Sequence, residues 1–135
     1  MIKKILGKIV TKTQLIKEAK KLVGEFRLSK HFLSAGSVGA ALVTKAGNVY
    51  TGICIDLACG IGFCAEHSAI AEMLKHRETE IKMIVAVAKH GIIPPCGRCR
   101  EMIAQVDRNN LNTLVILSER KAVRLKVLLP NLWFK

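Results

Sequence analysis

The residues best suited to chemistry lie in two short cysteine segments, at positions 64–67 and 94–99. The first reads Cys-Ala-Glu-His, and the second reads Pro-Pro-Cys-Gly-Arg-Cys. Thiolates are good zinc ligands, and a zinc ion with only three protein ligands keeps its fourth position open for water. We therefore predict that Cys64, Cys96 and Cys99 hold a catalytic Zn²⁺ ion.

Glu66 follows the first predicted ligand by two positions, so its carboxylate can lie over a metal ion without binding it. A carboxylate in this place can take a proton from water and pass it to a substrate. We predict that Glu66 is the catalytic acid and base.

Both cysteine segments are predicted to begin helices. Helix-favouring residues follow Cys64, and Pro95 stands just before Cys96, where its missing N–H would have had no helical partner. Cys96 and Cys99 would then lie one turn apart on one helix face. Two helix N-termini that face each other also stabilise thiolates, because their unpaired N–H groups carry partial positive charge.

Three thiolates on a divalent ion leave a net negative charge, which positive donors nearby should offset. Arg98 and His67 lie inside the two segments and are the candidates for this role. Arg98 is the stronger of the two because a guanidinium is always charged.

The same cysteines allow less specific interpretations. A lone Cys-x-x-Cys is often a redox pair or half of a structural zinc site, and a closed structural site needs a fourth ligand. Cys54 or Cys59 could supply that ligand. Otherwise these two cysteines are expected to be small buried residues without a function.

Together, the three cysteines and the glutamate resemble the all-cysteine form of the zinc deaminase signature. From about residue 37 to residue 130 the chain resembles the cytidine deaminase family in its small, three-cysteine, tetrameric form. Further similar segments are 37–42 and 47–52, which match the family's first hairpin, and 128–130 near the end. Residues 95–100 look most like the blasticidin S deaminase branch, which has an arginine between the cysteines.

This resemblance implies a zinc-dependent hydrolytic deaminase that converts cytidine or deoxycytidine to uridine or deoxyuridine and releases ammonia. It also implies that the backbone of Ala65 reads the pyrimidine edge. The protein would be a homotetramer whose active sites borrow residues from neighbouring subunits. Its role would be pyrimidine salvage or antibiotic resistance.

The sequence departs from the family where the sugar would bind. The family's Asn-x-Glu pair is replaced by Cys54-Ile55-Asp56. Asp56 can still accept a hydrogen bond from a hydroxyl group, but Cys54 is a weak partner. The family's aromatic residue before the Val-Gly-Ala-Ala run is missing, with Gly36 near its place, and its arginine after the glutamate is His67.

These departures leave two alternatives beside cytidine deamination. One is the deamination of another cytosine-containing compound, such as blasticidin S. The other is a non-enzymatic, zinc-stabilised module that binds nucleic acid through its basic residues.

The net charge is +12, and residues 1–30 contain nine Lys or Arg against two Glu. With few aromatic residues to stack on bases, we expect a solvated basic face and a small-molecule substrate rather than nucleic acid.

The rest of the chain is predicted to form one domain, residues 1–135, of the α/β class. We expect a three-layer α/β/α arrangement with a mixed central sheet of about five strands. Thr13 is predicted to cap a helix that extends to Phe26. Strands are predicted at 38–44, 49–55, 82–88 and 113–117, with a glycine-rich loop at 58–63 before the first cysteine helix.

An odd number of cysteines, five, without a signal peptide predicts a reducing compartment, the cytoplasm. No apolar stretch is long enough to cross a membrane.

The tail contains Leu132, Trp133 and Phe134. This cluster is expected to pack on the core or on another subunit; alternatively, Trp133 or Phe134 covers the bound base.

Overall fold

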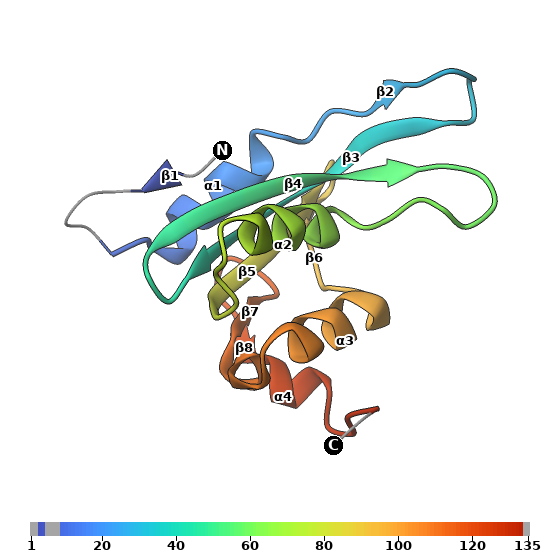
Figure 1. The fold of residues 1–135 in the computed structure, drawn as a ribbon. Coiled ribbons are helices and arrows are strands. Elements are labelled where there is room, and N and C mark those ends of the chain that lie inside the picture. The colour runs from blue at the N-terminus through green and yellow to red at the C-terminus, as the bar shows by residue number, and fades with distance from the viewer. Residues whose placement is uncertain (1–2, 5–8, 134–135) are drawn as a thin grey trace.

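A long antiparallel hairpin lies at the centre of the fold (Figure 1). Its strands are β3 (Ser34–Thr44) and β4 (Asn48–Asp56). The structure is a computed structural model that describes residues 3–4 and 9–133. Gly47 closes the turn with a φ of 89°, a value that glycine adopts without strain. The predicted hairpin is thus confirmed, with both strands slightly longer than expected.

Further strands extend this hairpin into a mixed sheet. β5 (Ile81–Ala88) pairs antiparallel with β3, and β7 (Leu114–Ile116) pairs parallel with β5. Four shorter strands complete the sheet: β1 (Lys3–Lys4), β2 (Phe26–Arg27), β6 (Gly91–Ile93) and β8 (Ala122–Arg124). The order is β1-β4-β3-β5-β7-β8, with β2 also paired to β3 and β6 to β5.

Helices cover both faces of the sheet and make three layers (Figure 1). The helices are α1 (Lys12–Lys20), α2 (Ala65–Lys75), α3 (Gly97–Val106), the 3-10 helix η1 (Arg108–Asn112) and α4 (Leu125–Leu128). Because successive strand residues face opposite sides, β3 serves two cores. Ala41 and Val43 pack with α1, whereas Ala40 and Leu42 pack with α2 and α3. The α/β class with a mixed sheet is confirmed.

Three details differ from the predictions. The sheet has eight strands over the described residues instead of about five, because four of them, β1, β2, β6 and β8, are too short to give a sequence pattern. The cap of α1 is Thr11 and not Thr13: the Thr11 hydroxyl accepts from the Gln14 amide at 3.2 Å, and the Gln14 side chain accepts from the Thr11 amide at 2.8 Å. The helix ends at Lys20, so Phe26 lies in β2.

None of the helices that the described residues form has both the length and the apolar character needed to span a bilayer.

Gly52 of β4 allows α2 to lie directly on the sheet. A Cβ atom at this position would overlap the Ser68 hydroxyl group and the backbone nitrogen of Ala69. Both residues belong to the first half of α2, so this glycine sets how closely the start of that helix approaches the sheet.

We expect Gly52→Ala to lower the free energy of unfolding by about 1–3 kcal/mol, since overpacking of a close contact carries this cost. Gly24→Ala is the matched control, because a Cβ at Gly24 meets no atom within 4 Å. Urea unfolding measures both variants. An equal effect of the two substitutions would contradict a special packing role for Gly52.

Candidate active site

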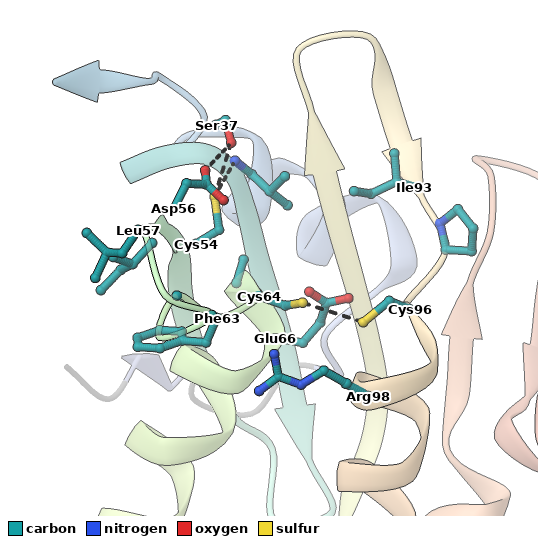
Figure 2. A pocket seen from close by; sticks show the side chains of 16 residues that line it. Ser37, Cys54, Asp56, Leu57, Phe63, Cys64, Glu66, Ile93, Cys96 and Arg98 are labelled. Carbon is teal, nitrogen blue, oxygen red and sulfur yellow. Dashed lines mark hydrogen bonds between the residues drawn. The ribbon is translucent and has the colours of Figure 1, made fainter. Parts of the chain in front are cut away.

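Two helix N-termini bring the three predicted cysteine ligands together. Cys64 is the N-cap residue of α2, Cys96 is the N-cap residue of α3, and Cys99 lies one turn further along α3. The Cys64 and Cys96 sulfur atoms are 3.5 Å apart, and those of Cys96 and Cys99 are also 3.5 Å apart. Figure 2 shows the first pair facing each other across the pocket.

The sulfur triangle fits a zinc ion. All three sulfur atoms lie within 4.8 Å of one another. Zn–S bonds of about 2.3 Å in a tetrahedral site place sulfur atoms about 3.8 Å apart, close to the separations seen here. Among the described residues the group contains no fourth member: Cys54 is buried elsewhere, and Cys59 is exposed. The donor set therefore suits a zinc site with an open position, and the closed structural site gains no support.

The three thiols differ in their tendency to ionise. Burial alone would raise the pKa of Cys96, but the backbone N–H groups of Cys99 and Arg98 and the neighbouring thiols outweigh it and lower that pKa. Burial raises the pKa of Cys64, and burial with the negative charge of Glu66 raises the pKa of Cys99. A metal ion that binds here must displace the protons of the latter two thiols.

Glu66 lies beside the sulfur triangle in the first turn of α2 (Figure 2). Its side chain is buried, with 5% of the residue exposed, and it lines the same pocket as Cys64 and Cys96. Burial raises the pKa of Glu66 above its ordinary value. A carboxyl group that gains and loses a proton more readily near neutral pH is suited to acid and base chemistry.

Arg98 and His67 are in different electrostatic states. Arg98 is exposed and reaches from α3 toward α2 (Figure 2). His67 is buried, and its Nε2 atom has no hydrogen-bond partner among the described residues. Burial, together with the charge of Arg98, lowers the pKa of His67 and favours its neutral form. Of the two candidates, Arg98 is therefore the one that carries a positive charge.

The pocket in front of the sulfur triangle has a volume of about 430 Å³. This volume lies within the range of about 300–1,000 Å³ that is typical of small-molecule sites. Ala65, whose backbone was expected to read a substrate edge, also lines the pocket. Its N–H is among the first of α2 and has no partner within the helix, so it can donate to a ligand.

A polar cluster of Ser37, Cys54 and Asp56 lines the pocket away from the sulfur triangle (Figure 2). The Ser37 hydroxyl oxygen is 3.1 Å from the Cys54 sulfur and donates to the Asp56 carboxylate at 3.4 Å. The Cys54 sulfur also accepts from the Val38 amide at 3.3 Å. Cys54 is thus held by the protein, and the remaining oxygen lone pairs of Asp56 are free to accept hydrogen bonds from a ligand.

Ser37 was not predicted as a site residue. In the sequence it lies near the start of a strand, and only the pairing of β3 with β4 brings it to Cys54 and Asp56. A serine or threonine at the end of a strand next to the one that carries candidate site residues is the signal that could have identified it.

The loop at 57–62 forms another wall of the pocket. Ile55 and Phe63 pair across its base through two backbone hydrogen bonds of 3.0 and 2.9 Å. Gly62 permits this closure, because a Cβ there would overlap the Ile55 carbonyl oxygen. The glycine-rich loop predicted at 58–63 is therefore part of this wall, where Gly60 and Gly62 line the pocket.

The tail does not enter the pocket within the described residues. Trp133 is 81% exposed, and its backbone N–H donates to the Glu101 carboxylate at 3.1 Å. Leu132 is partly buried and packs against the hydrophobic core. Phe134 lies outside the described residues, so its predicted role stays a prediction.

Known proteins resemble the chain in both sequence and structure. A family model described as the cytidine and deoxycytidylate deaminase zinc-binding region matches residues 11–115. A cytidine deaminase from Halalkalibacterium halodurans is 37% identical over 71 residues, which are 51% of this chain and 54% of that protein. The matched part of the chain spans about half the length of the curated relatives.

Solved structures extend the likeness to nearly the whole fold. A cytidine deaminase from Burkholderia pseudomallei has a TM-score of 0.73 at 29% identity, covering 91% of this chain and 99% of that one. A mutant cytidine deaminase from Mycobacterium tuberculosis has a TM-score of 0.76 at 24% identity, covering 92% of this chain and 98% of that one. The latter comparison concerns the fold alone.

We expect Cys96→Ala to abolish stoichiometric zinc binding, because two thiols cannot complete a three-ligand site. Cys59→Ala is the matched control, since Cys59 is a free, exposed cysteine outside the triangle. Elemental analysis of the dialysed proteins gives the zinc content per chain. Full zinc occupancy in the Cys96→Ala protein would refute the ligand assignment.

Proposed function

The chain belongs to the cytidine and deoxycytidylate deaminase zinc-binding family, and on that premise we propose that it is a zinc-dependent hydrolytic deaminase. Its proposed reaction converts cytidine or deoxycytidine to uridine or deoxyuridine with release of ammonia, which gives it a role in pyrimidine salvage. One observation carries the proposal: a triangle of three sulfur atoms has a buried glutamate beside it, in a pocket of small-molecule size.

Cys64, Cys96 and Cys99 are the proposed zinc ligands. When bound, zinc supplies a Lewis acid that makes water a good nucleophile at neutral pH. Glu66 is the proposed proton carrier: its carboxylate would accept one proton from the attacking water and deliver it to the ring nitrogen. It would then accept the proton of the newly formed hydroxyl group and deliver it to the leaving amine. The raised pKa of Glu66 supports this role, because the group must be a base at one stage and an acid at the next.

The remaining site residues are proposed to position the substrate and to balance charge. The backbone N–H of Ala65 donates to the pyrimidine edge. Arg98 offsets the negative charge of three thiolates, and His67, held neutral by its burial, supports the start of α2. Asp56 accepts hydrogen bonds from the substituent on the ring, with Ser37 and Cys54 fixing its orientation.

The polar cluster favours a second candidate substrate. A thiol that already accepts from the Val38 amide has little capacity to bind a sugar hydroxyl, whereas the Asp56 carboxylate attracts a positively charged substituent. A cytosine-containing compound with a cationic side group, such as blasticidin S, is therefore the alternative substrate, with a role in resistance.

Assembly and location complete the proposal. We propose a homotetramer, because the exposed Trp133 and Phe32 leave apolar surface that a neighbouring subunit would cover. Light scattering on the protein eluted from a size-exclusion column measures its mass, and a monomer would refute this assembly.

We also propose that the protein acts in the reducing cytoplasm, since oxidation of Cys64 or Cys96 would destroy the site. Fractionation of cells tests this location.

We expect Glu66→Gln to reduce kcat by about a hundredfold to ten-thousandfold while zinc stays bound, since this is the contribution of general acid and base catalysis. Ammonia release from cytidine and from blasticidin S, together with the zinc content, measures both effects. Glu18→Gln is the control, because Glu18 lies on α1 at the opposite face of the sheet. A Glu66→Gln protein that turns over either compound at the normal rate would contradict the assignment.

Asp56→Asn distinguishes the two substrates. For a cationic compound we expect KM to rise about tenfold or more, because a charged hydrogen bond contributes about 1.5–3 kcal/mol. For cytidine the rise should be smaller, since an amide oxygen still accepts from a hydroxyl. Steady-state kinetics on both compounds give the ratio of the two effects. Equal changes in KM would show that Asp56 does not select for charge.

A further inference from the structure

A second cavity lies on the α1 face of the sheet, opposite α2 and α3. We call it the hairpin pocket, because residues of the β5–β6 turn line it. Its volume is about 400 Å³, within the range of about 300–1,000 Å³ typical of small-molecule sites. Ile16, Val87 and Ile92 give the pocket an apolar floor. Lys20, Lys89 and His90 give it a basic rim.

The basic side chains of the rim have no hydrogen-bond or ion-pair partner among the described residues. Lys20, Lys89 and His90 are all exposed. Glu119 adds one negative charge to the rim, so the two lysines leave the pocket net positive. An apolar floor with a basic rim suits a small organic anion, meaning an apolar ring that carries a phosphate, sulfonate or carboxylate group.

β6 connects the hairpin pocket to the candidate active site. Its neighbouring residues Ile92 and Ile93 face opposite sides, as strand geometry requires. Ile92 lines the hairpin pocket, and Ile93 lines the pocket in front of the sulfur triangle. The strand then continues through two prolines into Cys96, so a shift of β6 moves both a wall of the active site and one proposed zinc ligand.

We propose that the hairpin pocket binds a small organic anion and that this binding is coupled through β6 to the candidate active site. The coupling rests on the proposed function, whereas the anion site does not. By linkage, each ligand then changes the affinity of the other by the same factor.

The anion site is tested with 1-anilinonaphthalene-8-sulfonate, an aromatic sulfonate whose fluorescence rises in apolar surroundings. We expect one saturable site per chain on the zinc-loaded protein. The double substitution Lys20→Gln and Lys89→Gln should raise its Kd about tenfold or more, because it removes two charged donors. Lys30→Gln with Lys82→Gln is the control: it removes the same charge from exposed lysines outside the pocket.

Three results would overturn the anion site. The first is an equal loss of affinity in the two double variants, which would reduce the effect to net charge. The second is the absence of saturable binding. The third is a changed light-scattering mass of the Lys20→Gln and Lys89→Gln protein, which would make the pocket a contact between subunits instead.

The coupling is tested with Glu66→Gln protein, in which bound cytidine stays intact. Saturating cytidine should change the Kd of the sulfonate about fivefold or more. An unchanged Kd, with equilibrium dialysis showing that cytidine is bound, would overturn the coupling alone. Dialysis that shows no bound cytidine or blasticidin S would contradict the proposed function and the coupling with it, while the lysine variants still decide the anion site.

Discussion

The structure depends on holding three sulfur atoms at the meeting point of two helix N-termini. If all three thiols were ionised without an ion between them, their negative charges would repel one another, and the helix dipoles would offset only part of this. The positions of α2 and α3 must therefore be fixed by packing elsewhere. Gly52 lets α2 lie on β4, and β6 with its two following prolines delivers the start of α3.

Most of the sulfur triangle could be predicted from the sequence because its geometry is local. The spacing of Cys96 and Cys99 places them one turn apart on any helix, and Pro95 marks where that helix begins. Cys64 and Glu66 are related in the same way at the start of α2. Only the contact between the two cysteine segments depends on the sheet, which brings them together. The strand predicted between them, at 82–88, was a strong enough pattern to indicate that sheet.

The place of Ser37 in the polar cluster and the hairpin pocket could not be predicted, because they arise from contacts between distant segments. Ser37 meets Cys54 and Asp56 across a register shift between β3 and β4, which no local pattern reveals. The cap of α1 was assigned to the wrong threonine for a different reason. Thr11 and Thr13 are both good caps, and the reciprocal bonds with Gln14 decide between them.

The pair of backbone hydrogen bonds between Ile55 and Phe63 has a consequence for how a ligand enters. A loop that is tied together at its base resists swinging away as a lid, which favours a preformed wall of the pocket in the free protein. Binding then avoids the loss of conformational entropy that ordering a mobile loop would require. The same rigidity limits the protein to ligands that already match the cavity, so selectivity at this wall comes from shape and not from adaptation.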